Sequence, residues 1–265
     1  MKSTGVRAHT YIRNLAASGR HSFTSSEAHS ALGTSTAAVK LALHRLIRQG
    51  ELASPGRGTY VIVPPEYRSL GCLPAEQFIP ALMEQAGLPY YAGLLTAAQY
   101  HGAAHHRPQV FQVMLTQARR PLRCGQVRVA FSVRKRLQEV AVQSFNTPRG
   151  MIQVSAPEGT AVDLVGYQHQ VGGLEHVVTV LSELAEHLDP LKLVDAAHTA
   201  PLPWAQRLGH LLEQAGAVEK AAPLKSYVTE TARETVLLLP GVRSEQERRD
   251  ANWKLIVNAN VEPEV

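Results

Sequence analysis

The side chains best suited to chemistry in the first part of the chain are cations at helical spacing. Lys40, His44, Arg45 and Arg48 fall within residues 36–49, and no acidic residue interrupts that run. Lysine and arginine neutralise phosphate oxygens, and arginine also donates paired hydrogen bonds to the edge of a guanine. These residue types at this spacing therefore predict a surface that binds a polyanion.

A helix over residues 36–49 would position these side chains. Val39, Leu43, Leu46 and Ile47 stand at i, i+4, i+7 and i+8, which places them on one apolar stripe. A helix that buries this stripe turns its other face outward, and small residues near its start suit entry into the major groove of DNA. The predicted DNA-facing residues of this segment are Thr34, Ser35, Ala37, Lys40, Leu41, His44, Arg45 and Arg48. A solvated basic face, with Leu41 covered by a neighbour, is the alternative interpretation.

The residues before this helix predict a helix-turn-helix. Helices are expected over residues 4–17 and 25–32, with a short strand over 21–23 between them. Thr24 and Glu27 form a capping-box pattern, in which the hydroxyl and the carboxylate each accept from the other residue's backbone amide. Gly33 suits the left-handed position after a helix, and Thr34 or Ser35 would cap the next one. Two short helices joined at a glycine are typical of this motif.

The residues after the helix predict a β-hairpin. Strands are expected over residues 52–53 and 59–62, around a turn over 54–58 that contains two glycines. Arg57 would lie at its tip without a neighbouring acid, where a guanidinium suits the negative potential of the minor groove. A solvated arginine in an ordinary hairpin remains the alternative. Three helices followed by a hairpin predict a winged helix-turn-helix over residues 1–64, which ends at Pro64-Pro65.

Length and charge favour two domains and an anionic partner. The chain has 265 residues and a formal net charge of +5. Residues 1–64 carry eight Lys/Arg against two Glu, residues 65–136 carry nine against three acids, and residues 137–265 carry ten against seventeen. Such asymmetry suggests that the first half meets an anion. No apolar stretch reaches the roughly eighteen residues of a membrane span, and Cys72 and Cys124 lack metal-ligand spacing, so a cytoplasmic protein without membrane contact is expected.

Residues 70–265 predict a larger α+β domain, because strands come first and helices follow. Two helices are expected over residues 74–85 and 92–101. Strands are expected over residues 110–115, 126–133, 139–145 and 151–155. Helices follow over residues 157–167, 174–187, 191–198 and 204–215, and short strands over 235–239 and 253–258.

A second basic region lies between Glu84 and Glu139, where the chain has no acidic residue. The window carries Arg107, Arg119, Arg120, Arg123, Arg128, Arg134, Lys135 and Arg136. Of these, Arg119, Arg120, Arg123, Arg134, Lys135 and Arg136 are the candidates for a second basic patch at strand ends. The patch could hold more DNA backbone, an acidic protein or RNA, or it could be a solvated edge.

The sequence offers little that predicts catalysis. His101, His105 and His106 lie close together, but no nearby cysteine or carboxylate completes a metal shell. The phosphate-binding glycine-rich loops, the nucleophile elbow, and the acid two residues before a lysine that many nucleases need are all missing. Glu158 and Asp163 are expected to solvate a helix. No catalytic residue, metal or cofactor is therefore predicted. A winged-helix-targeted nuclease and a protein-interaction module remain as alternatives to a regulator.

Four blocks of the sequence, in the same order, resemble one known family. They are Ser35–Val39 with Arg57–Tyr60, Tyr90–Ala98 with His101-Gly102, Val154–Val165 with Gly172–Leu174, and Arg249–Asn258. The chain resembles the abortive-infection E antitoxins, the AbiEi-type transcriptional regulators of type IV toxin–antitoxin systems.

The resemblance implies a repressor that binds repeated sites in its own promoter. It implies that the DNA-reading residues lie between Thr34 and Arg48 and at Arg57, and that the second domain carries the neutralising activity. It also implies a nucleotidyltransferase toxin encoded beside the antitoxin, although the type IV class does not require the two proteins to touch. No residue of the second domain is assigned to neutralisation.

Overall fold

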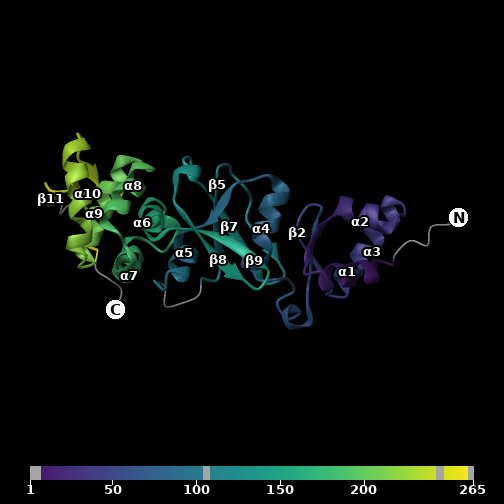
Figure 1. Cartoon of the computed structure of the whole chain (residues 1–265). Helices are drawn as coiled ribbons and strands as arrows, with labels where there is room; N and C mark the ends of the chain where they lie inside the picture. The colour runs from purple at the N-terminus through teal and green to yellow at the C-terminus, as the bar shows by residue number, and fades with distance from the viewer. Residues whose placement is uncertain (1–6, 104–107, 243–247, 262–265) are drawn as a thin grey trace. The chain divides into compact units, whose positions relative to one another are not determined.

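The computed structural model describes residues 7–103, 108–242 and 248–261. His105, His106 and Arg107 of the sequence analysis lie outside these residues. The chain is mixed α and β, with a small helical region first and a larger α/β region after it (Figure 1). By contacts it divides into two compact units. Unit 1 comprises Met1–Tyr90, Gln109–Val133 and Ser144–Gln153, and unit 2 comprises Tyr91–Pro108, Arg134–Gln143 and Val154–Val265.

Unit 1 begins with three helices and a three-stranded antiparallel sheet of order β1-β3-β2. This is the element order of a winged helix-turn-helix. Phe23 and Leu43 are buried in its core, where Phe23 packs edge-on to Tyr11 and stacks on Tyr60. The elements are α1 (Ala8–Ala17), β1 (Ser22–Thr24), α2 (Ser25–Leu32), α3 (Thr36–Arg48), β2 (Leu52–Gly56) and β3 (Thr59–Ile62).

The predicted caps form. Thr24 Oγ1 accepts from the Glu27 amide at 3.1 Å, and Glu27 Oε2 accepts from the Thr24 amide at 2.7 Å, so the capping box at the start of α2 is confirmed. Gly33 adopts the predicted left-handed conformation (φ 59°), which ends α2. Ser35, rather than Thr34, caps α3 and accepts from the Ala38 amide at 3.3 Å. The short turn that these residues fix sets α3 against α2.

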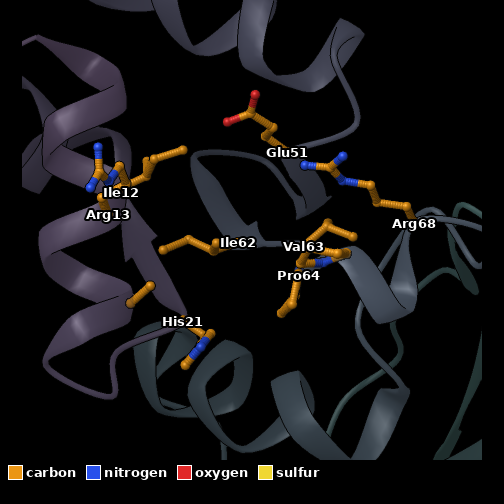
Figure 2. A pocket seen from close by; sticks show the side chains of 10 residues that line it. Ile12, Arg13, His21, Glu51, Ile62, Val63, Pro64 and Arg68 are labelled. Carbon is orange, nitrogen blue, oxygen red and sulfur yellow. The ribbon is translucent and has the colours of Figure 1, made fainter.

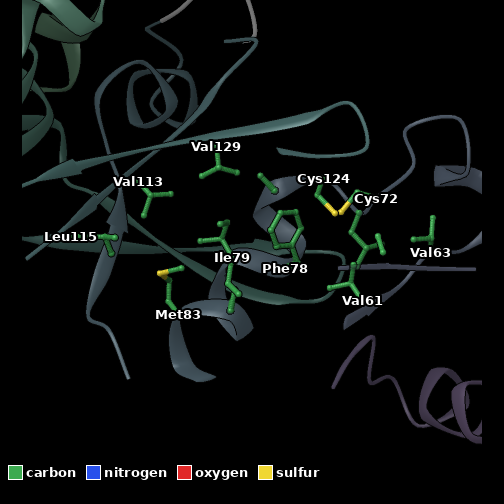
Figure 3. Close-up of a cluster of buried hydrophobic side chains, with 14 residues drawn as sticks. Val61, Val63, Cys72, Phe78, Ile79, Met83, Val113, Leu115, Cys124 and Val129 are labelled. Atoms are coloured by element: carbon green, nitrogen blue, oxygen red, sulfur yellow. The ribbon is translucent and has the colours of Figure 1, made fainter. Parts of the chain in front are cut away.

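The hairpin of the winged helix packs onto a second layer of unit 1. In this layer β7 (Val127–Val133) lies between its neighbours, parallel to β5 (Phe111–Leu115) and antiparallel to β6 (Leu122–Cys124). Helix α4 (Ala75–Ala86) packs on β7. Figure 3 shows the core that the two layers share, in which Val61 and Val63 approach Phe78 and Cys72. The predicted domains 1–64 and 70–265 stay a prediction, and by contacts the first compact unit extends beyond residue 64.

Unit 2 is built around α6 (Pro157–Gly166), whose residues from Pro157 to Val165 are all buried. Helices α5, α7, α8 and α9 pack around it. These helices are α5 (Leu94–Tyr100), α7 (Leu174–Leu184), α8 (Pro190–His198) and α9 (Leu202–Gln214), and α10 (Val218–Thr231) packs on α8 and α9. Figure 1 shows α6 to α10 in green to yellow and α5 in blue. The expectation that Glu158 and Asp163 solvate their helix is wrong, because both face the interior.

Short strands complete the fold. Strand β4 (Tyr90–Ala92) pairs in parallel with β9 (Gly150–Ser155) through Ala92 and Val154, and β8 (Val142–Thr147) neighbours β9. A small sheet has β12 (Leu255–Val257) between β10 (Val236–Leu237) and β11 (Arg248–Asp250). Single-turn helices occur at Pro65–Tyr67, Leu137–Glu139, Gln168–Gln170 and Ala185–His187. Helix α10 and the strands β4, β6 and β11 are absent from the sequence prediction.

Candidate nucleic-acid interface

Helix α3 is held by the apolar stripe that the sequence predicts. Val39, Leu43 and Leu46 are buried, and Ile47 packs partly against the same core. Burial of a leucine-sized side chain contributes about 1.5–3 kcal/mol, so this stripe fixes the rotation of the helix about its axis. The opposite face must then point outward.

The outward face carries the predicted side chains, and all of them are exposed. Leu41, the one large apolar residue among them, is 53% exposed, so the alternative in which a neighbour covers it does not describe this structure. The exposed residues are Thr34, Ser35, Ala37, Lys40, Leu41, His44, Arg45 and Arg48, together with Arg57 of the hairpin. Their exposure allows a role in DNA binding, and the role itself stays a prediction.

Both acids of residues 1–64 are engaged by side chains away from α3. Glu27 closes the capping box and pairs with Arg20. Glu51 lies 3.3 Å from His9, measured between Oε1 and Nε2. Within the described part of the chain, the cations of α3 and Arg57 form no ion pair. The outward face of α3 therefore keeps its positive charge without local compensation.

The hairpin displays Arg57 from a constrained turn. Gly58 has φ 76°, a conformation that favours glycine, and its carbonyl accepts from the Ser25 amide at 2.8 Å. Ser54 Oγ donates to the Thr59 carbonyl at 3.0 Å across the hairpin. Thr59 Oγ1 also donates to Gln85 Oε1 of α4 at 3.0 Å. These bonds restrain the backbone on both sides of Arg57, so its guanidinium extends from a fixed base.

Of the candidate second patch, Arg119, Arg120 and Arg123 belong to unit 1. Arg119 lies beside the hairpin, since its Nη2 would be 3.8 Å from a Cβ placed on Gly56, and its guanidinium covers the ring of Phe131 at 5.1 Å. Arg123 is exposed and pairs in register with Arg128. Because Cys124 and Val129 face the core beside α4, strand alternation turns Arg123 and Arg128 to the other face of the sheet. Arg119 therefore lies on a different face from Arg123.

Arg134 is buried, so the prediction that it belongs to a surface patch is wrong. Its side chain is 4% exposed, and its Nε donates to Asp163 Oδ1 at 2.8 Å. Its two terminal nitrogens donate to the carbonyl and hydroxyl oxygens of Thr199, each at 2.8 Å. Lys135 and Arg136 are exposed and belong, like Arg134, to unit 2. Arg136 also donates to the His198 carbonyl at 3.0 Å.

The partner of Arg134 completes a buried polar network that the sequence analysis missed. Tyr91 donates its hydroxyl proton to Asp163 Oδ2 at 2.6 Å. Burial raises the pKa of Asp163 above its ordinary value, and Arg134 and the Tyr91 hydroxyl offset only part of this rise. Burial also raises the pKa of Tyr167 to about 12 and that of Tyr91 further. A carboxylate with these donors is satisfied internally, so the network holds unit 2 together and offers no free acid or base.

A hollow of about 220 Å³ lies on the winged helix between α1 and the residues that follow β3. Figure 2 shows Ile12 and Ile62 at its apolar wall, with Arg13, Glu51 and Arg68 around it. Pockets for drug-sized ligands have volumes of about 300–1,000 Å³. The hollow is smaller than that range, and its mixture of apolar, basic and acidic side chains does not indicate a particular ligand.

The described residues contain no group of three or more His, Cys, Asp or Glu side chains that could hold a metal ion. The ring of His101 lies 2.7 Å from the Ser155 carbonyl, measured from Nε2, so this histidine has a structural partner. Glu158 accepts from the Asp189 amide at 2.9 Å. Among the residues that the structure describes, every helix is too short or too polar to cross a lipid bilayer.

Two family models match successive parts of the chain. Residues 10–63 match a family model described as a transcriptional regulator, AbiEi antitoxin, and residues 91–214 match one described as the AbiEi antitoxin C-terminal domain. The crystal structure of the RV2827C protein from Mycobacterium tuberculosis aligns with a TM-score of 0.66 over 96% of this chain and 94% of that chain. The sequence identity is 17%, so this likeness shows the fold alone. No curated protein matches the chain significantly.

Proposed function

The chain belongs to the AbiEi antitoxin family, whose members are transcriptional regulators, and from this premise we propose that it represses its own operon. In this proposal it binds double-stranded DNA at repeated sites in the promoter and acts as the antitoxin of a type IV system. The toxin that it counteracts is a nucleotidyltransferase. The chain itself has no enzymatic role.

The observation that carries the DNA-binding part is the unpaired positive face of α3. The helix has 13 residues, which is about 20 Å at 1.5 Å per residue, and one face along its length is exposed. Short side chains near its start allow close approach to base edges, and Arg45 and Arg48 near its end reach phosphates. Arg57 would meet the neighbouring minor groove. Arg119, beside the hairpin, would add a further phosphate contact.

The test compares two charge changes within the winged helix. Arg48→Glu with Arg57→Ala is expected to abolish retardation of the chain's own promoter fragment in a gel-shift titration. For the binding that remains at low salt, the loss of about two cationic contacts flattens the slope of log K against log salt concentration by roughly 2. Arg13→Glu, on the exposed side of α1, is the matched control and should leave binding within about twofold. Unchanged binding by the α3 and hairpin variant would refute the assigned surface.

Two further outcomes separate the alternatives. A chain that retards no DNA even at low salt would be a protein-interaction module. Cleavage of plasmid DNA in the presence of Mg²⁺ or Mn²⁺ would show a nuclease, and no cleavage is expected. Both experiments use the full chain.

The antitoxin role has its own test. The toxin gene and this chain are expressed together from promoters that the chain does not control, and cell growth is measured. Because the second domain is proposed to neutralise the toxin, the Arg48→Glu, Arg57→Ala variant should still restore growth. Loss of rescue in this variant, at equal protein level, would show that neutralisation needs the DNA-binding face.

A further inference from the structure

The two cysteines of the chain lie in neighbouring segments of unit 1. Cys72 precedes α4, and Cys124 ends β6. The segments are joined by Gln126, whose amide donates to the Leu70 carbonyl at 2.8 Å and whose side chain donates to the Ser69 carbonyl at 2.9 Å. These bonds fix the backbones beside both cysteines.

The backbones approach as closely as glycine allows. Gly125 has φ 59°, and a Cβ placed there would lie 2.3 Å from the Leu70 carbonyl oxygen. Both thiols are free and buried, Cys72 completely and Cys124 at 5% exposure. Figure 3 shows their sulfur atoms turned toward each other. Two thiols that face each other avoid the diverging side-chain directions that rule out a disulfide.

We propose that Cys72 and Cys124 are a redox pair that forms a reversible intramolecular disulfide beneath the hairpin of the winged helix. The oxidant is a peroxide, and a small-molecule thiol reverses the reaction. No other cysteine competes within the chain.

The surroundings of the two sulfurs assign different roles to them. Cys72 donates to the sulfur of Cys124, which lowers the pKa of Cys124 and, together with burial, raises that of Cys72. Cys124 is also the less buried of the two. Since the thiolate is the nucleophile, Cys124 reacts first.

The reaction balances in two steps. Cys124 loses its proton, and its thiolate attacks one oxygen of hydrogen peroxide. The O–O bond breaks, the sulfur becomes a sulfenic acid, and the other oxygen leaves with that proton as water. The Cys72 thiol then attacks the sulfenic sulfur, the S–O bond breaks, and a second water leaves as the S–S bond forms. Two thiols are oxidised by two electrons, and one peroxide is reduced. A small-molecule thiol, used twice, returns both cysteines by exchange.

The hairpin is connected to this pair. The backbone of Ser54 in β2 lowers the pKa of the Cys124 thiol, and Ala53 and Val61 lie in the same buried cluster as Cys124. Forming the disulfide moves the Cys124 sulfur, which packs in the same cluster as these hairpin residues. The base from which Arg57 extends therefore depends on the redox state of Cys124.

The test oxidises the full folded chain with stoichiometric hydrogen peroxide, denatures it, and adds N-ethylmaleimide before intact-mass measurement. We expect the oxidised protein to be lighter by two hydrogens and to take up no maleimide, whereas the reduced protein takes up two. A small-molecule thiol should restore both adducts. The disulfide should raise Tm by several degrees, because it closes a long loop in the unfolded chain.

Three outcomes overturn the proposal: two adducts after oxidation, a disulfide found only between molecules, or a bond that forms only when the chain is unfolded. The Cys72→Ala variant sharpens the test, since Cys124 alone should then retain a sulfenic acid that dimedone traps. The wild-type mass measurement does not depend on any variant folding.

The expected effect of the disulfide on DNA binding rests on the proposed function, and it is measured separately from the mass change. The oxidised chain should bind the promoter fragment with an affinity changed severalfold, and the Cys72→Ala, Cys124→Ala variant should be insensitive to peroxide. If neither redox form binds DNA, the proposed function fails while the mass result still decides the disulfide.

Discussion

Arg48 and Arg134 are the same residue type in two acid-free stretches of the sequence, and the fold treats them in opposite ways. Arg48 ends α3, is exposed, and has no acidic partner among the described residues. Arg134 follows β7, is 4% exposed, and is held by Asp163 and Thr199. The comparison shows that local charge density does not place an arginine at a surface. An arginine can be buried when an acid from a distant helix pairs with it in the interior.

The cost of burial explains the difference. An isolated charge in the interior loses several kcal/mol of hydration, so it is buried only with a partner that satisfies it. Arg134 meets a carboxylate, a hydroxyl, a carbonyl and the ring of Trp204, which lies 5.3 Å from its Cζ. The winged helix offers Arg48 no such set. Arg134 therefore contributes to stability, and Arg48 is left to bind a partner.

The largest expected effect comes from removing the charge of Arg134. Arg134→Met leaves Asp163 buried without its ion-pair partner, which should lower the free energy of unfolding by about 3–5 kcal/mol. The measurement is urea unfolding followed by circular dichroism. Arg48→Met is the matched control, and a surface change of this kind should stay within about 0.5 kcal/mol. Equal stability of the two variants would break the comparison.

A double variant sharpens that result. Arg134→Met with Asp163→Leu removes both charges and should be more stable than Arg134→Met alone, because no unpaired charge remains. If the double variant is the less stable one, packing rather than charge accounts for the loss.

The second effect concerns DNA and reverses the order of the two arginines. Arg48→Met should raise the Kd for the promoter fragment about tenfold, and the salt slope should fall by about 1, because one phosphate contact is lost. Fluorescence anisotropy over a series of salt concentrations measures both quantities. Arg13→Met should change neither. If a folded Arg134→Met sample binds DNA as weakly as Arg48→Met, the assignment of stability to Arg134 and of DNA binding to Arg48 is wrong.

A smaller effect is expected at the cap that holds Glu27 away from α3. Thr24→Ala removes the hydroxyl that accepts from the Glu27 amide and should cost about 1 kcal/mol. Thermal unfolding of the full chain reports this loss as a fall in Tm. Ser26→Ala, an exposed position in the first turn of α2, is the control and should leave Tm nearly unchanged.

The smallest expected effect is the pH dependence of stability that Glu27 contributes. The hydrogen bond from Arg20 holds the pKa of Glu27 below its ordinary value of 4.5. The stabilisation is therefore fully present above that value and is lost as the pH falls through the lower folded pKa. Its size is limited because the Glu27 side chain is 40% exposed. Tm measured between neutral and acidic pH should fall less steeply in Glu27→Gln. Parallel curves would contradict this.

The sequence predicted the winged helix closely because its signals are local. The Thr24 and Glu27 pair, Gly33, and the stripe from Val39 to Leu46 act over a few residues, and the structure contains each as expected. The prediction missed α10, where Pro223, a residue that normally interrupts a helix, lies inside the helix. Contacts with α8 and α9 stabilise this helix where its own pattern does not. Strands β4, β6 and β11 are three residues each, too short for alternation to be recognised.

The candidate site divides in the same way. The exposure of the α3 face follows from the period of one helix. The positions of the arginines in the second basic patch depend on residues from other elements. Arg134 is buried because it donates to Asp163, and the guanidinium of Arg119 lies over the ring of Phe131. The pairing of Cys72 with Cys124 also spans distant segments, and no spacing rule could have found it.

The sequence by itself determined which face of α3 is apolar, which residues cap its neighbours, and that no acid accompanies its cations, because these properties depend on neighbours within one or two helical turns. Only the tertiary structure decided which cations remain free, which acid is buried, and which thiols meet. Those outcomes follow from the balance between desolvation and pairing, and the partners that set this balance are brought together only when the chain folds.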